Sequence, residues 1–237
     1  MKLTYLYNSG FVIENERFMI VIDYFKDTKE GFVQQAINSY PKRIYVFVSH
    51  WHPDHFNREV MQWKQKRPDI CYVFSNDIRK KMVWMKFPGV VFLERGQAWK
   101  DDMLCVKAFG STDVGSSFLI EAEGKQIFHA GDLNNWHWNE EATPKESHAA
   151  ECDFLNEIAL IAETTTQLDV AMFPVDPRQG KDYMLGAEQF VERIRTKVFA
   201  PMHFGDNYNK AQAFQSLAEA AGCRFIGWKT RGETIEF

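Results

Sequence analysis

Three histidines and an aspartate fall within the six residues at positions 50–55, in the order His50, His52, Asp54 and His55. Imidazole suits zinc, iron and other borderline divalent metals, and carboxylate widens that range. Because a proline follows His52, the segment is held out of helical dihedrals, and His50 and His52 point to the same side of an extended chain. The spacing differs from that of a zinc finger, and no cysteine pair accompanies it. It therefore predicts a catalytic metal site rather than a structural one.

The histidine-rich segment follows a continuous run of apolar and β-branched residues at positions 44–48, which is typical of a buried strand. The candidate ligands therefore lie where a strand opens into a loop, a frequent position for catalytic groups. Two further candidates occupy similar positions. Asp132 follows a predicted strand at residues 126–130 and a glycine that permits a sharp turn. His203 follows a predicted strand at residues 197–200.

The rest of the chain alternates between strand-like and helical patterns, without an internal repeat or a low-complexity linker. Further strands are predicted at residues 3–7, 11–14, 17–22, 70–74, 90–93, 104–109, 117–122, 170–174, 224–226 and 234–237. Helices are predicted at residues 28–39, 57–66, 76–82, 142–163, 187–195 and 210–221. This order of elements predicts one layered α/β domain with two sheets over residues 1–237.

Composition and charge narrow the classes of function. The chain has 237 residues, 45% of them hydrophobic, which is enough for a substantial core. A net charge of −4 without a long basic run argues against nucleic acid as the main partner. The cysteines are scattered, which indicates free thiols in a reducing cytoplasm, and the sequence predicts neither a signal peptide nor a membrane span. The expected partner is a small-molecule substrate, and a homo-oligomer is compatible with the sequence.

The sequence resembles the metallo-β-lactamase superfamily, and within it the small bacterial metal-dependent hydrolases that include ascorbate-6-phosphate lactonase-like proteins. Residues 50–55 match the HxHxDH motif of that family. Asp132 lies in its Gly-Asp motif, and His203 lies in its last histidine motif. Residues 7–23 resemble its opening β-hairpins, with Asp23 at the family's usual early aspartate. The resemblance covers nearly the whole chain.

The resemblance implies an αββα four-layer sandwich with metals at one edge of the two sheets. By this resemblance, His50 and His52 would bind the first metal. Asp54, His55 and His203 would bind the second metal, and Asp132 would bridge the two. Asp54 and Asp132 are the expected catalytic carboxylates. Asp54 would orient the metal-activated hydroxide, and Asp132 would bridge the two metals that share it. Zinc is the expected metal, as one or two ions, and manganese or iron fits the same ligands.

One histidine motif of the family is altered in this chain. Ser111 stands where a histidine would complete the first metal site, and a hydroxyl is a far weaker zinc ligand than imidazole. Three interpretations compete: Asp113 replaces the missing ligand, His137 reaches into the site, or the first site is weak or empty. A weakened or rebuilt first site is favoured, because ligand number decides occupancy. Asn134, His137 and Trp138 closely follow the bridging aspartate and are candidates for lining the substrate pocket.

These features predict a metal-dependent hydrolase in which a metal-bound hydroxide attacks a small ester, lactone or phosphodiester. A lactone of a sugar phosphate is suggested by the family likeness alone. The alternative is a non-hydrolytic metal-binding or regulatory protein with a degraded first metal site. The missing histidine favours that alternative, whereas retention of the other six ligand positions argues against it.

Overall fold

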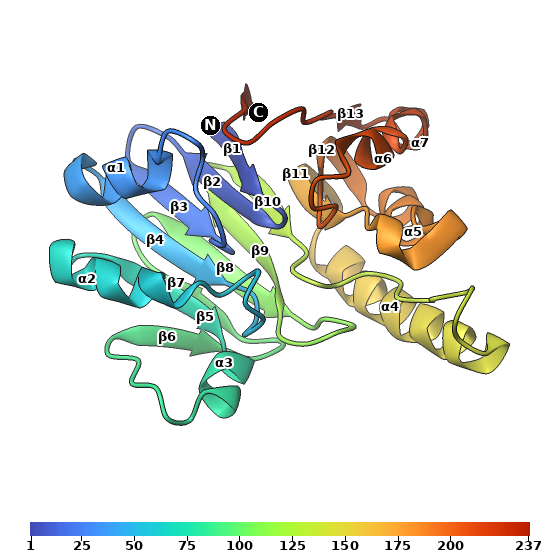
Figure 1. Ribbon diagram of the computed structural model, residues 1–237, viewed down its shortest axis with the longest axis horizontal. Coiled ribbons are helices and arrows are strands. Elements are labelled where there is room, and N and C mark those ends of the chain that lie inside the picture. Colours follow the sequence, from blue (N-terminus) through green and yellow to red (C-terminus); the bar gives the residue numbers. More distant parts are fainter. The chain divides into compact units, whose positions relative to one another are not determined.

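The computed structural model describes residues 1–237, which divide into two compact units. One unit comprises residues 1–94 and 228–237, and the other comprises residues 95–227. Each unit carries its own seven-stranded sheet and its own helices, so the predicted mixed α/β class with two sheets is confirmed (Figure 1). None of the helices combines the length and the apolar character that a bilayer span requires.

The sheet of the first unit has the strand order β14-β1-β2-β3-β4-β5-β6. Its strands are Lys2–Tyr7 (β1), Gly10–Glu14 (β2), Phe18–Ile22 (β3), Arg43–Val48 (β4), Cys71–Ser75 (β5), Val90–Leu93 (β6) and Thr234–Glu236 (β14). Antiparallel pairing joins β14, β1, β2 and β3, whereas β3 to β6 pair in parallel. Parallel strands require crossover connections, and these carry α1 (Phe32–Ser39), η1 (Arg58–Gln62), α2 (Trp63–Lys66) and α3 (Asn76–Lys81).

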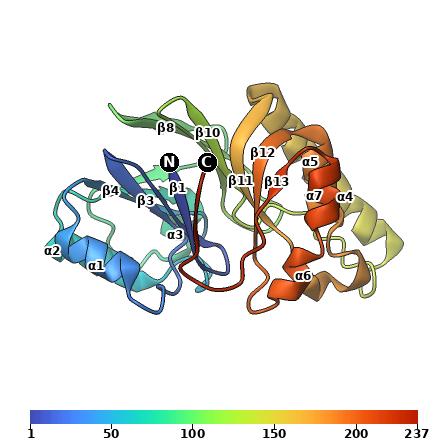
Figure 2. The same cartoon turned by 90° about the horizontal axis from the view of Figure 1, so that it is seen from above.

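The core of the first unit lies between the sheet and these helices. Met19 and Val21 of β3 join Val33 and Ile37 of α1 in one buried hydrophobic cluster. Figure 2 shows α1 and α2 along the same face of this sheet. All five residues of β3 are buried, as are the last five of β4, so both faces of these strands are covered. This burial explains why the sequence of β4 is a continuous apolar run.

The second unit repeats this pairing scheme with the strand order β13-β12-β11-β10-β9-β8-β7. Its strands are Ala98–Lys100 (β7), Leu104–Phe109 (β8), Ser117–Ala122 (β9), Lys125–His129 (β10), Gln167–Pro174 (β11), Arg195–Met202 (β12) and Arg224–Phe225 (β13). β7 to β10 pair antiparallel, and β10 to β13 pair in parallel. The crossovers carry α4 (Pro144–Thr164), η2 (Pro177–Asp182), α5 (Leu185–Arg193), α6 (Tyr208–Gln212) and α7 (Gln215–Ala220).

The longest helix of the chain, α4, confirms the helix predicted at residues 142–163. A capping box begins it, because Thr143 accepts from the backbone N–H of Glu146 while the Glu146 carboxylate accepts from the backbone N–H of Thr143. Phe154, Ile158 and Ile161 form its buried stripe. Figure 2 shows α4, α5 and α7 on the same side of β11 and β12.

The structure differs from the sequence prediction mainly at helix ends. The helix predicted at 28–39 begins only at Phe32, because the Asp27 carboxylate accepts from the backbone N–H groups of Val33 and Gln34 and caps the first turn. The helix predicted at residues 210–221 is two short helices, α6 and α7. The three-residue edge strand β7 was not predicted, since it is mostly exposed and lacks an apolar pattern.

Candidate metal-binding site

The predicted histidine ligands of the first unit leave the carboxyl end of β4. The His52 carbonyl accepts from the backbone N–H groups of His55 at 3.0 Å and Phe56 at 2.8 Å, which closes the segment into a tight turn. That turn brings the rings together. His50 Nε2 and His52 Nδ1 are 3.0 Å apart, and the ring centroids of His50 and His55 are 4.0 Å apart. The prediction that His50 and His52 point to the same side is therefore confirmed, whereas the segment forms a turn instead of staying extended.

Asp23 fixes the orientation of His55 from the end of β3. Its buried carboxylate accepts from the backbone N–H and the hydroxyl of Ser49, at 2.7 and 2.6 Å, and Oδ2 lies 2.7 Å from His55 Nδ1. A carboxylate only accepts, so His55 Nδ1 carries the proton and Nε2 is left as the ligand nitrogen. Asp23 holds this position with a left-handed φ of 47°, the kind of backbone strain that is retained at functional sites.

Asp54, a half-buried predicted ligand of this unit, is positioned from the opening hairpin. Asn8 Nδ2 donates to Asp54 Oδ2 at 3.0 Å, and the same carboxylate oxygen lies 3.6 Å from His55 Nε2. Asn8 sits in the turn between β1 and β2 with a φ of 54°, and its backbone N–H donates to the Tyr5 hydroxyl. No pattern in the sequence indicated that Asn8 contacts Asp54.

In the second unit, Asp132 and His203 follow β10 and β12, as predicted. The carboxyl ends of parallel strands gather at one edge of a sheet, which is why residues distant in sequence meet there. His203 Nε2 lies 3.3 Å from Asp132 Oδ1. Both side chains are about 5% exposed, so the contact is nearly dry. Gly131 with a φ of 55° and His203 with a φ of 62° turn the chain sharply at the ends of the two strands.

Asp176, which follows β11, fixes the orientation of His203. Its Oδ2 lies 3.0 Å from His203 Nδ1, and it accepts from Arg178 Nε at 2.9 Å. Burial raises the pKa of Asp176, but the hydrogen bonds from His203 and Arg178 outweigh burial and hold that pKa below its ordinary value. The ionised carboxylate therefore keeps the proton on His203 Nδ1 and leaves Nε2 as the ligand nitrogen, as Asp23 does for His55.

The altered third motif brings Asp113, rather than an imidazole, close to Asp132. One carboxylate oxygen of Asp113 and one of Asp132 lie within 4.8 Å of each other. Ser111 stays half-buried at the turn, where its hydroxyl accepts from the backbone N–H of Asp113 at 3.3 Å. Of the two substitute ligands suggested by the sequence, Asp113 is therefore the one that this unit brings close to Asp132.

His137, the other suggested substitute, is held by its own loop. Its Nε2 donates to the carbonyl of Asp182 at 3.1 Å, and its Nδ1 accepts from the backbone N–H of Asn139 at 3.1 Å. Both ring nitrogens are thus engaged, and the side chain is only 2% exposed. Reaching a metal would cost both hydrogen bonds and the burial of the ring.

The segment that follows Asp132 places a tryptophan beside the predicted ligands. Trp136 Nε1 donates to the carbonyl of Asp132 at 2.8 Å, and its ring meets the His203 ring edge-on at 5.7 Å between centroids. The Trp138 ring stacks on the Trp136 ring, with 6.0 Å between their centroids. Asn134 is fully buried, and its backbone is hydrogen-bonded to Thr112 Oγ1. Trp136 is therefore the aromatic side chain in contact with His203, and Trp138, a candidate for lining the pocket, packs against Trp136.

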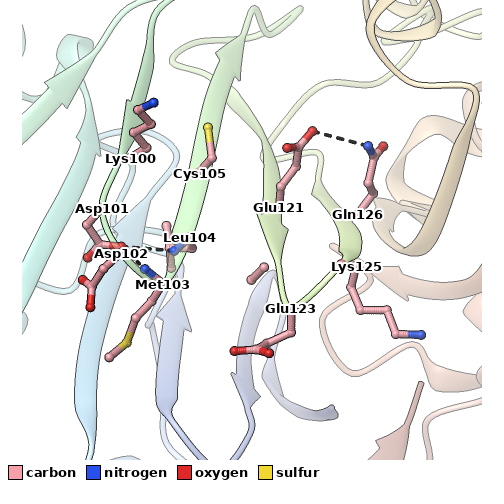
Figure 3. A pocket seen from close by; sticks show the side chains of 12 residues that line it. Lys100, Asp101, Asp102, Met103, Leu104, Cys105, Glu121, Glu123, Lys125 and Gln126 are labelled. Carbon is pink, nitrogen blue, oxygen red and sulfur yellow. Dashed lines mark hydrogen bonds between the residues drawn. The ribbon is translucent and has the colours of Figure 1, made fainter.

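A surface pocket of about 400 Å³ lies at the β7–β8 turn and the β9–β10 turn, and none of these candidate ligands lines it (Figure 3). Its polar side chains bond to near neighbours. Asp101 accepts from the backbone N–H groups of Met103 and Leu104, and Gln126 donates to Glu121 at 3.3 Å. The chemistry-bearing residues of the second unit thus lie at the opposite ends of these strands.

Comparisons with known proteins identify the family of this chain and several similar sequences. A family model described as a beta-lactamase superfamily domain matches residues 2–149. A metal-dependent hydrolase of Symbiobacterium thermophilum is 28% identical over 215 residues, which cover 86% of this chain and 84% of that protein. A metal-dependent hydrolase of Pyrococcus abyssi is 23% identical over 220 residues, with the same coverage of 86% and 84%.

Solved structures with a similar fold differ in chemistry. Igni18, a metallo hydrolase of the archaeon Ignicoccus hospitalis, superposes with a TM-score of 0.69 at 21% identity, covering 100% of this chain and 98% of Igni18. CmlA, a diiron β-hydroxylase of Streptomyces venezuelae, superposes with a TM-score of 0.68 at 12% identity, covering 100% of this chain and 54% of CmlA. At such identities the likeness establishes the fold alone, and it confirms the predicted fold class.

Proposed function

Because this chain belongs to the metallo-β-lactamase superfamily, we propose that it is a metal-dependent hydrolase acting on a small ester, lactone or phosphodiester. The observation that carries the proposal is a pair of matched contacts. Asp23 and Asp176 each hold Nδ1 of a histidine, His55 and His203, at 2.7 and 3.0 Å. Each histidine is thereby left with Nε2 as its ligand atom, which is the arrangement that metal-binding imidazoles need. The curated relatives are named metal-dependent hydrolases, which supports the same function.

The donor set fits a divalent cation, because it consists of imidazole and carboxylate groups. For His55 and His203, a buried aspartate fixes which ring nitrogen carries the proton. In the proposal the family's ligand pattern applies to this chain, and the ligands are His50, His52, Asp54, His55, Asp132 and His203. Zinc is the favoured metal, and manganese or iron suits the same groups. When bound, the metal supplies a hydroxide near neutral pH and polarises the scissile bond.

The chain's own residues orient and shield this chemistry. Asn8 holds Asp54 at 3.0 Å, so that the Asp54 carboxylate is placed to orient the attacking water. Trp136 covers the His203 ring and limits access of bulk water to it. The proximity of Asp113 to Asp132 supports Asp113 as the substitute for the missing histidine. The four cysteines are free thiols, which supports a cytoplasmic location as part of the proposal.

The second candidate function is metal binding without hydrolysis, for which Ser111 at the position of a histidine ligand is the specific observation. The first of the two metal sites has fewer strong ligands and would bind its ion weakly, so that only the second site would hold an ion and less hydroxide would be activated. This candidate predicts tight binding of one metal ion per chain and no turnover of any substrate in a chemically broad panel.

The test combines metal content and turnover in the same protein samples. The wild-type chain, His55→Ala and Asp132→Ala are loaded with zinc or manganese, freed of loose ions, analysed for metal and assayed on an aryl ester, a lactone and a phosphodiester. Asp153→Ala, which removes an exposed carboxylate from α4, is the matched control. We expect both ligand variants to lose metal and turnover while the control keeps both. Ligand variants that retain the wild-type rate would sink the hydrolase proposal, and metal-loaded protein without any turnover would favour the second candidate.

A further inference from the structure

The loop that joins α3 to the edge strand β6 carries two large apolar side chains into solvent (Figure 1). Val83 is 81% exposed and Trp84 is 65% exposed, and the only other large hydrophobic side chain that is exposed is Leu160, at 38%. Adjacent exposed apolar side chains with a polar rim are typical of interaction sites. The Val83–Trp84 tip is therefore a candidate for contact with a partner.

The loop cannot bury this tip by folding inward, because its other apolar residues already pack on the core beneath it. Met82 belongs to the buried hydrophobic cluster of the first unit, and Met85 and Phe87 are partly buried against the same cluster. The backbone N–H of Met85 donates to the Met82 carbonyl at 2.9 Å, which turns the chain at Val83 and Trp84. The exposure of the tip thus follows from the packing of the loop.

The segment that surrounds the tip is basic, although the chain as a whole is acidic. Residues 58–94 contain eight lysines and arginines and four aspartates and glutamates, a net charge of +4, whereas the whole chain carries −4. Two of these cations are neutralised, since Lys80 pairs with Glu94 at 2.7 Å and Arg67 pairs with Asp69 at 2.9 Å. The other six lysines and arginines form no ion pair with a carboxylate.

Several of these unpaired cations lie over aromatic rings close to the tip. The distances from the charged group to the ring centroid are 4.9 Å for Arg58 over Trp84, 4.7 Å for Lys81 over Trp51 and 5.5 Å for Arg79 over Phe92. A ring orients a cation but does not cancel its charge. Lys86, two residues after Trp84, is exposed. The apolar tip is therefore bordered by positive charge that an anionic partner can neutralise.

Three kinds of anionic partner can be compared with this surface. A specific protein interface buries about 800 Å² on each partner, far more than two side chains supply. A nucleic acid would stack on Trp84 and pair its phosphates with the cations, but it would leave the aliphatic side chain of Val83 without a contact. An anionic membrane uses every feature, because apolar side chains and indole rings enter its interfacial region while lysine and arginine attract its head groups.

We propose that the first unit binds the surface of an anionic lipid membrane through the Val83–Trp84 tip, with Arg58, Lys81 and Lys86 facing the lipid phosphates. Each lysine or arginine near such a surface raises the affinity about fivefold, so these three cations together contribute about a hundredfold. Surface binding of this kind requires no helix that crosses the bilayer. None of these residues is a proposed metal ligand, so the proposal goes beyond the hydrolase function and does not depend on it.

The experiment uses the full-length protein with vesicles of phosphatidylcholine alone or of equimolar phosphatidylcholine and phosphatidylglycerol. Sedimentation with sucrose-loaded vesicles measures affinity, and quenching of tryptophan fluorescence by brominated acyl chains reports insertion. Trp84→Ala removes the ring, and Trp84→Phe keeps an apolar ring that does not give the tryptophan signal. Lys86→Gln removes one charge beside the tip.

Two matched controls make equivalent changes elsewhere on the surface. Leu160→Ala shortens the exposed apolar side chain of α4, and Lys145→Gln removes an exposed charge from the first turn of the same helix. A labelled single-stranded oligonucleotide, titrated in parallel and followed by fluorescence anisotropy, tests nucleic acid as the partner.

We expect the wild type to bind the anionic vesicles and not those of phosphatidylcholine alone. Trp84→Ala should weaken binding about tenfold, and Lys86→Gln should weaken it about fivefold. Trp84→Phe should bind nearly as well but lose the quenching, and both controls should bind as the wild type does. The proposal is overturned if the anionic vesicles are not bound, if both kinds of vesicle are bound equally, or if quenching persists in Trp84→Phe. Binding of the oligonucleotide but not of the vesicles would also overturn it and would assign the surface to nucleic acid.

Discussion

Replacing Asp23 with asparagine should weaken metal binding through His55 while leaving the shape of the site almost intact. The Asp23 carboxylate receives two hydrogen bonds from Ser49 and faces His55 Nδ1 at 2.7 Å. In Asp23→Asn the amide oxygen can stay with the Ser49 backbone N–H, which places the NH₂ group opposite Ser49 Oγ and His55 Nδ1. The serine hydroxyl can rotate and accept, but the imidazole must shift its proton to Nε2, the nitrogen assigned to the metal.

The size of the effect follows from the single charge-assisted contact that is lost. A hydrogen bond to a charged group contributes about 1.5–3 kcal/mol, and loss of such a partner to a metal-binding histidine lowers metal affinity about 10- to 100-fold. The two estimates agree, since a tenfold change corresponds to about 1.4 kcal/mol. The larger value is expected here, because both Asp23 and His55 are fully buried and water cannot replace the lost bond.

Competition with a chromophoric chelator measures this affinity directly, on protein whose circular dichroism and unfolding midpoint are recorded alongside. Asp153→Asn is the matched control. It makes the same change at an exposed carboxylate of α4, outside the proposed ligand set, so its metal affinity should match that of the wild type. If a folded Asp23→Asn variant binds metal as tightly as the wild type, the orienting role of Asp23 is refuted.

Four further predictions concern the second unit and its thiols. Asp176→Asn should lower metal affinity about tenfold in the same chelator assay, and unchanged affinity would contradict its role toward His203. Phe173→Ala should cost about 3–5 kcal/mol of unfolding free energy in urea, because the ring is fully buried, whereas Val83→Ala, at 81% exposure, should cost less than about 0.5 kcal/mol. Burial raises the pKa of the Cys223 thiol from 9.0 to about 11, so iodoacetamide at pH 8 should modify the exposed Cys152 well before Cys223. The same shift disfavours the folded state once the unfolded thiol ionises, so stability that is intact below pH 9 should decline as the pH rises through 11, which urea midpoints would show.

Local patterns predicted the elements that present the ligands, because those patterns report burial and chain breaks. The continuous apolar run at residues 44–48 became β4, a strand covered on both faces, and the histidine segment follows it as expected. Asp132 and His203 likewise follow β10 and β12. The helical segment predicted at residues 57–66 begins where expected, since the Asn57 side chain caps η1 by accepting from the backbone N–H of Glu59. Each of these features depends on residues close together in sequence.

The residues that orient the ligands could not be predicted in the same way. Asn8 and Asp54 are 46 positions apart, Asp23 and His55 are 32 apart, and Asp176 and His203 are 27 apart. Their contacts arise from strand pairing, which brings together the ends of strands that long connections separate in the sequence, and no short-range pattern encodes that pairing. A search for acidic residues directly after each predicted strand would have marked Asp176, which follows β11 as Asp132 follows β10.

The central claim is that this chain hydrolyses its substrate through a bound divalent metal. The most direct test follows the hydrolysis rate of the best substrate from the ester, lactone and phosphodiester panel in one protein sample, before chelation, after chelation and after metal is restored. The account predicts that the rate falls to the uncatalysed background and returns with zinc, manganese or iron. A rate that persists in metal-free protein would contradict it, as would fully metal-loaded protein that turns over none of the panel.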